Sequence, residues 1–193
     1  MTLTPEREYV KITKDYTLAA AKAFQGIPSL AENKDEPFRF IFVSAIGATH
    51  QPGAFTSAFA RVKGETEMAL AEMMQRTSAA TSGRKFHAHS ARPCWPDYFA
   101  HDAIKPYIPK QPLGLTALAW GLTPLVRIPG VGVKSYWNPT QHLGRTLTEL
   151  AMGKWDGEMA KVQEGATGNG LERLPGGSTM LETTALRRFA GLD

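Results

Sequence analysis

The sequence predicts an α/β protein in which helices flank a sheet of parallel strands. Residues 38–43, FRFIFV, are almost continuously apolar, which is typical of a strand buried on both faces of a parallel sheet. Residues 58–74 then repeat apolar side chains at steps of three or four, which predicts a helix. A second strand pattern, KFHAHSAR, covers residues 85–92. Strand, helix and strand in this order indicate a parallel crossover.

The N-terminal part predicts one further helix before the first strand. Thr4 is a capping residue, Pro5 suits the first helical position, and an apolar stripe continues from Glu6 to Phe24. Residues 25–37 form a loop with a charged run, and residues 77–84, rich in Ser, Thr, Ala and Gly, form another.

The C-terminal half predicts helices and loops. Residues 95–136 are rich in Pro, Gly and aromatic side chains. A helix from Pro139 to Met152 ends at the C-cap Gly153. Residues 155–177 are polar and glycine-rich, which favours a mobile loop, and residues 178–192 predict a last short helix.

Length and composition indicate one ordinary globular domain, residues 1–193. Hydrophobic residues make up 42% of the chain and charged residues 21%, which excludes a disordered protein. The net charge is +4, with Lys and Arg scattered, so we expect no nucleic-acid partner. Attraction to anionic ligands such as dinucleotide phosphates stays open.

The single cysteine, Cys94, excludes an internal disulfide and a zinc site, and it favours a reducing compartment, the cytoplasm. Cys94 has no base beside it in the sequence, which argues against a catalytic thiol. His87 and His89 share one face of their strand, but no carboxylate or thiol is spaced to join them, so we expect no metal.

No membrane-spanning segment is expected. The N-terminal residues have no apolar signal core. The stretch Leu113 to Val133 carries Arg127 and is broken by prolines and glycines, so it predicts a buried or amphipathic helical lobe.

Two polar residues in the first strand-loop-helix unit could carry chemistry. Ser44 ends the strand, where ligands bind in open α/β sheets, and Lys63 lies in the first turns of the helix. Phe59 is four residues before Lys63 and shares its helix face. The runs VSAIGA and FARVKGETE resemble the short-chain dehydrogenase/reductase superfamily, in its atypical, nucleoside-diphosphate-sugar epimerase-like branch. The run HSARP resembles the branch's turn beside the nicotinamide, with Cys94 in place of the usual Gly.

The resemblance implies an NAD(P)-dependent oxidoreductase or epimerase acting on a carbonyl compound or a nucleotide sugar. Ser44 would polarise the substrate oxygen, Lys63 would hold the nicotinamide ribose, and Arg92 and Pro93 would line the pocket. Phe59 stands at the position of the family's proton-donating Tyr and has no proton to give, so catalysis should be impaired. The alternative is a non-catalytic interaction protein that keeps the scaffold.

The resemblance also implies a partial doubly wound, Rossmann-like parallel sheet. Residues 1–93 would be the remainder of its core, and residues 94–193 a C-terminal, helical substrate lobe. No glycine-rich turn follows a predicted strand anywhere in the sequence. The chain therefore resembles a truncated member of the branch that lacks the N-terminal nucleotide-binding half, and NAD(P) binding should be weakened. The first strand would then have an open edge, through which two copies of the chain could pair.

Overall fold

The computed structural model describes residues 4–27, 36–78, 85–108, 121, 136–163 and 166–193. Its centre is a five-stranded sheet in the order β1-β2-β7-β6-β5. β1, β2 and β7 are parallel, whereas β6 and β5 run antiparallel to their neighbours. The strands are β1 Phe38–Val43, β2 Phe86–Arg92, β5 Thr167–Gly168, β6 Leu171–Arg173 and β7 Thr179–Glu182. The predicted mixed α/β class with a mainly parallel sheet is confirmed.

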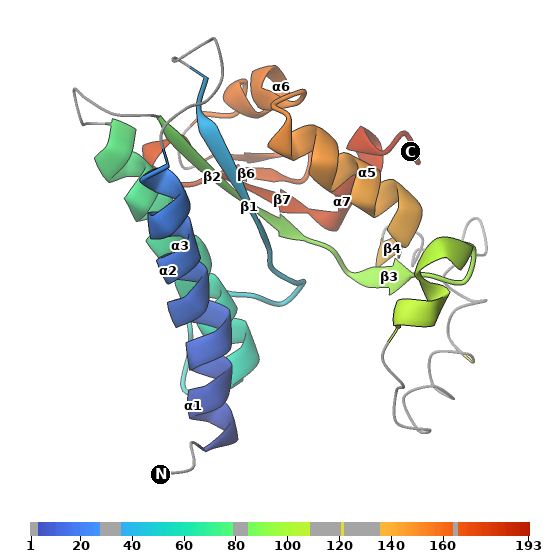
Figure 1. Cartoon of the computed structure of the whole chain (residues 1–193), viewed down its shortest axis with the longest axis horizontal. Coiled ribbons are helices and arrows are strands. Elements are labelled where there is room, and N and C mark those ends of the chain that lie inside the picture. The colour runs from blue at the N-terminus through green and yellow to red at the C-terminus, as the bar shows by residue number, and fades with distance from the viewer. Residues whose placement is uncertain (1–3, 28–35, 79–84, 109–120, 122–135, 164–165) are drawn as a thin grey trace.

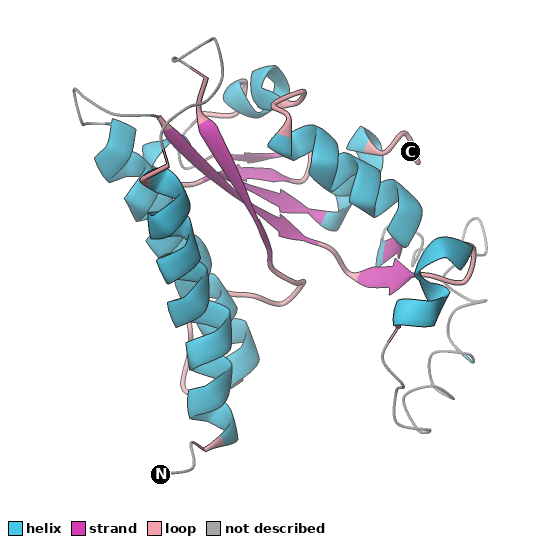
Figure 2. Ribbon diagram, viewed as in Figure 1, coloured by secondary structure: helices cyan, strands magenta, loops and turns pink. Residues whose placement is uncertain are grey.

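Helices cover both faces of this sheet (Figures 1 and 2). On one face, Phe42 and Phe86 pack with Ala21, Leu70 and Met74 of the helices. On the other face, a second core joins the sheet to the C-terminal helices and includes Ala91, Leu150, Met159, Leu181, Leu186 and Phe189. The first face carries α2 Tyr16–Gln25 and α3 Ala58–Ser78, and the second carries α5 Thr140–Ala151, α6 Asp156–Ala160 and α7 Thr183–Phe189.

β1 is an edge strand. It pairs with β2 along its whole length, from Phe38 opposite Phe86 to Val43 opposite Ala91, and it has no second partner among the described residues. Its side chains are therefore mostly half-buried, and that of Val43 is 47% exposed. The expectation of burial on both faces is wrong for β1, while β2, which has a neighbour on each side, is almost entirely buried.

The N-terminal helix is interrupted rather than continuous. α1 Pro5–Val10 and α2 are joined by a π-helical segment, Lys11–Asp15. Thr4 occupies the N-cap position and Pro5 the first turn, as expected, but the Thr4 side chain makes no capping hydrogen bond.

Two predictions in the C-terminal half are wrong. Within residues 155–177, expected to form a loop, the structure has α6 and a β5–β6 hairpin that turns at Asn169 and Gly170, with φ of 53° and 76°. Asn-Gly is a strong signal for such a turn. Within residues 178–192, expected to be helical, β7 precedes α7, because residues 179–182 fill the buried gap between β2 and β6.

The remaining elements lie beyond the carboxyl end of β2. β3 Trp95–Asp97 and β4 Trp137–Pro139 form a small parallel pair, and a 3-10 helix, Asp102–Tyr107, follows β3. The predicted lobe Leu113 to Val133 lies outside the described residues, apart from residue 121. Among the helices that the structure describes, none is long and apolar enough to cross a membrane. α5 agrees with its predicted bounds, and Gly153 follows it with φ of 76°.

Candidate functional site

The first group of predicted site residues meets at the carboxyl end of β1. The Lys63 Nζ donates a hydrogen bond of 3.3 Å to the carbonyl oxygen of Val43. It also lies 5.4 Å from the ring centre of Phe42 and 5.6 Å from that of Phe59. Burial lowers the pKa of Lys63, and the charge of Glu67 partly offsets this effect. The structure thus brings Lys63 and Phe59 together at the end of β1.

Ser44 lies at the same end of β1 and is 4% exposed. Its backbone N–H donates to the Ala91 carbonyl at 2.7 Å, which extends the β1–β2 ladder by one residue. Since alternate residues of a strand share a face, its side chain lies on the α3 side, as that of Phe42 does. The hydroxyl has no partner within normal hydrogen-bonding distance in the described part of the chain, yet it is near enough to Glu67 to help lower the pKa of that carboxyl.

A buried ion pair joins α3 to the end of β2. Arg92 Nε donates to Glu67 Oε1 at 2.9 Å, and Arg92 Nη2 donates to Glu67 Oε2. The Glu67 side chain is fully buried. Burial alone would raise the pKa of Glu67, but hydrogen bonds from His50 and Arg92 outweigh it and hold that pKa below its usual range. Burial likewise opposes the charge of Arg92, and the Glu67 carboxylate raises the Arg92 pKa overall.

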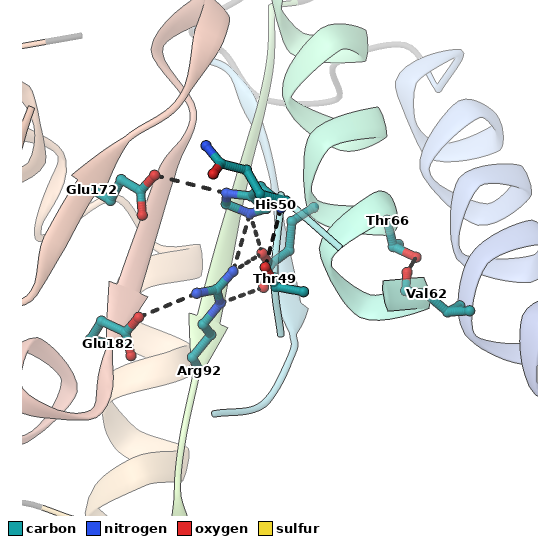
Figure 3. A network of polar contacts seen from close by, with 9 residues as sticks. Thr49, His50, Val62, Thr66, Arg92, Glu172 and Glu182 are labelled. Atoms are coloured by element: carbon teal, nitrogen blue, oxygen red, sulfur yellow. Dashed lines mark hydrogen bonds and ion pairs between the residues drawn. The ribbon is translucent and has the colours of Figure 1, made fainter. Parts of the chain in front are cut away.

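Three further residues complete this polar network (Figure 3). His50 Nε2 lies 2.6 Å from Glu67 Oε2, and His50 Nδ1 lies 3.8 Å from Glu172 Oε1. Arg92 Nη1 donates to Glu182 Oε1 at 3.3 Å. All three nitrogens of the Arg92 guanidinium therefore have acceptors within the protein.

Gly64 allows His50 to reach the network. The loop before α3 lies directly on the helix, where the Thr49 N–H donates to the Ala60 carbonyl at 3.1 Å. A Cβ on Gly64 would lie 1.8 Å from the Thr49 carbonyl oxygen, so only glycine permits this approach.

The residues after Arg92 serve mainly to hold segments together. The Pro93 carbonyl accepts a hydrogen bond of 3.4 Å from the Ile46 N–H, and the Cys94 N–H donates to Asn138 Oδ1 at 3.1 Å. Burial raises the pKa of the Cys94 thiol, which disfavours the nucleophilic thiolate at neutral pH. Among the described residues, no group of three or more His, Cys, Asp or Glu side chains could hold a metal ion.

Sequence reasoning missed Glu67 and His50 as members of the site. A signal for Glu67 was present, because it lies between the apolar positions Val62 and Leu70 and shares the buried side of α3 with Thr66. An acidic residue on that side needs a cation, and Arg92 was the candidate at the end of the next strand. His50 stands in an irregular loop, whose path no periodicity predicts.

Comparison with known proteins gives one informative relative. No protein-family model and no solved structure matches the chain. Botcinic acid biosynthesis cluster B protein 16 of Botryotinia fuckeliana (strain B05.10) is 37% identical over 176 residues, which cover 91% of this chain and 99% of that protein. The chain belongs to the family of that protein. The relative's name refers to a biosynthesis cluster and specifies no reaction.

Proposed function

We propose that this member of the cluster B protein 16 family serves the biosynthesis of a small molecule as an NAD(P)-binding protein of the atypical short-chain dehydrogenase/reductase type. The observation that supports this best is the grouping of Ser44, Lys63 and Phe59 at the carboxyl end of one parallel strand. The parallel order β1-β2-β7, with helices on both faces, is compatible with a partial Rossmann-like, doubly wound sheet.

Only part of the expected cofactor contact fits the residues present. The Lys63 ammonium has three donors and uses one on Val43, so it could still bind the hydroxyls of a nicotinamide ribose. Arg92 could not do the same, because Glu67 and Glu182 occupy its guanidinium. Ser44 would polarise a carbonyl only if a substrate reached its buried hydroxyl. Nicotinamide, when bound, supplies hydride transfer, and Phe59 leaves the accompanying proton without a donor.

Fluorescence titration with NADPH and NADH tests the proposal. We expect weak binding to the wild-type protein, since its 193 residues contain no glycine-rich phosphate turn. Lys63→Met should weaken that binding about tenfold or more, as loss of a charged hydrogen bond does. Lys161→Met, at a 69% exposed lysine of α6's C-cap, should leave it unchanged. Absence of binding to the wild-type protein would refute the cofactor proposal.

The Phe59→Tyr variant tests whether the site is otherwise intact. Phe59 is 44% exposed, so a phenolic oxygen can be added without creating a buried, unpaired hydroxyl. A gain of reductase activity on simple carbonyl compounds would support an impaired oxidoreductase. No gain, despite retained NADPH binding, would favour a protein that binds without catalysis.

The second candidate is a non-catalytic interaction protein in which two copies pair through β1. The edge position of β1 and the exposed Val43 support it, because an unpaired strand edge is a template for another strand. Size-exclusion chromatography with light scattering should show a dimer, and Val43→Lys should shift it toward monomer. A wild-type protein that stays monomeric at high concentration would exclude this candidate.

A further inference from the structure

A cavity of about 170 Å³ lies at the opposite end of the strands from the predicted site. Its walls include His87 near the amino end of β2, His89 at the middle of β2, Arg173 at the end of β6, and Asp156 at the start of α6. The thioethers of Met74 and Met159 provide apolar wall. This cavity is separate from the Lys63 and Arg92 groups, so a ligand could bind in it whether or not those groups have the function proposed for them.

His89 lines the cavity and carries an unpartnered ring nitrogen. The Thr179 N–H donates to His89 Nδ1 at 3.1 Å, so Nδ1 carries a lone pair and the proton of the neutral ring is on Nε2. Burial lowers the pKa of His89 to about 3, so the ring is neutral at physiological pH. The side chain is only 3% exposed, and its Nε2 has no partner among the described residues. A protonated Nε2 cannot ligate a metal ion.

Asp156 offers the cavity an acceptor. Arg39 donates to Asp156 Oδ2 twice, from Nε at 3.0 Å and from Nη2 at 2.8 Å. The other oxygen, Oδ1, is buried and has no partner in the described part of the chain. Gly153 makes this arrangement possible, because a Cβ there would lie 2.4 Å from the Arg39 guanidinium.

The surroundings of the cavity favour an anion. Arg173 lines it and donates from Nη1 to the Met159 carbonyl at 3.0 Å, which fixes the guanidinium at the wall. Arg39, Lys85 and Arg173 all act on His87 as nearby positive charges, and Asp156 is the opposing negative charge. Arg39 is also paired with Glu36 at 3.2 Å, so three cations face two carboxylates here. This balance favours a ligand with one negative charge.

We propose that this cavity binds a small hydroxycarboxylate. A carboxylate oxygen accepts from the Nε2–H of His89 and faces the Arg173 cation, while the neighbouring hydroxyl donates to Asp156 Oδ1. The carbon atoms pack on Met74 and Met159. A cavity of roughly 150 Å³ accommodates benzene, so lactate, with no more heavy atoms than benzene, fits the space. Each unpartnered atom of the wall thereby gains the partner that its chemistry requires.

Isothermal titration calorimetry with three small molecules distinguishes the contribution of the carboxylate to binding from that of the hydroxyl. L-Lactate carries both groups, propionate carries the carboxylate alone, and 1,2-propanediol carries hydroxyls alone. Lactate should bind about tenfold more tightly than either of the others, because each of them leaves one buried polar atom unpaired. Lactate that binds no better than propionate, or that does not bind at all, overturns the proposal.

A matched pair of variants tests the role of His89. His89→Asn places an amide oxygen where Nδ1 accepts from Thr179 and removes the ring Nε2–H. The His89→Asn substitution should weaken lactate binding about tenfold or more. His142→Asn makes the same change at a histidine of α5 that lies outside the cavity wall, and it should leave binding unchanged. Thermal melts establish that both variants fold, and unchanged lactate binding by a folded His89→Asn protein would contradict the assignment.

Discussion

The two ends of β2 treat buried polar groups in opposite ways. At the carboxyl end, Arg92 has an acceptor for each guanidinium nitrogen, and Glu67 receives hydrogen bonds from Arg92 and His50. At the amino end, His89 Nε2 and Asp156 Oδ1 are buried and, among the described residues, unpartnered beside a cavity. Polar atoms that already have hydrogen-bond partners within the protein can form few new bonds to a ligand. Polar atoms without partners at a cavity can still form theirs.

The end of the sheet that the family resemblance indicates is not the end where unpartnered polar atoms line a cavity. The carboxyl ends of parallel strands are the usual ligand site in open sheets, and the sequence resemblance refers to that end. In this protein the Glu67–Arg92 pair there joins α3 to β2. An unpartnered donor and an unpartnered acceptor line one cavity toward the amino end, where the sequence indicated no ligand site. The unpartnered hydroxyl at the carboxyl end, that of Ser44, lies beside Glu67.

The largest expected effect is that of breaking the buried ion pair. Arg92→Met should lower the free energy of unfolding by about 3–5 kcal/mol, because it leaves the Glu67 carboxylate buried without its cation. Urea denaturation gives this value. Arg76→Met is the matched control, because the Arg76 side chain is 78% exposed and pairs with Glu72 on the surface. Its cost should stay below about 1 kcal/mol. Equal costs for the two variants would mean that the network does not stabilise the fold.

The next effect concerns the approach of the loop to α3. Gly64→Ala should cost about 1–3 kcal/mol in unfolding free energy, since its methyl group meets the Thr49 carbonyl and forces the loop with His50 away. Gly144→Ala is the control, in a helix position with no atom within 4 Å of the new methyl group. It should stabilise the protein by up to about 1 kcal/mol. If Gly64→Ala were also stabilising, the close contact would be disproved.

The third effect depends on pH and concerns His89. His89 has a folded pKa of about 3 and an ordinary value of 6.5, so between these values the unfolded chain binds a proton that the folded chain does not. Stability therefore falls as the pH drops below 6.5. From pH 7 to pH 5, the wild-type protein should lose about 2 kcal/mol more unfolding free energy than His89→Asn.

Glu67 does not disturb this measurement. Its lowered pKa contributes stability that is present above its ordinary value of 4.5 and is lost as the pH falls through the folded value, below the window used. The pKa of His87 is lowered by burial and by the charges of Arg39, Lys85 and Arg173, which both proteins retain. Equal losses in the wild-type protein and His89→Asn would show that His89 is not a buried neutral ring.

The sequence predicted local elements well and long-range context poorly. The bounds of β1 follow from a continuous apolar run and those of α5 from an apolar stripe, and the structure agrees with both to within one residue. The strand β7 was mistaken for helix because its residues carry a helical pattern, and only the gap between β2 and β6 makes them a strand. The turn at Asn169 and Gly170 could have been predicted from its residue types alone.

In the candidate site, too, local features were predictable from the sequence and long-range features were not. Ser44, Lys63 and Phe59 were placed correctly at one strand end because strand, loop and helix are contiguous in the sequence. The cavity at the amino end could not be foreseen. His89 and Asp156 are far apart in the sequence, and an unpartnered atom becomes recognisable only when all of its neighbours are known.

Nuclear magnetic resonance of the histidine rings tests most directly whether the cavity that His89 lines binds a ligand. In protein labelled with ¹⁵N at histidine, His89 should carry its proton on Nε2 at pH 7, and that resonance should shift on addition of L-lactate while the ring of His142 does not. A proton on Nδ1 of His89, or an Nε2 resonance that lactate leaves unmoved, would contradict the assignment of this cavity as a binding site.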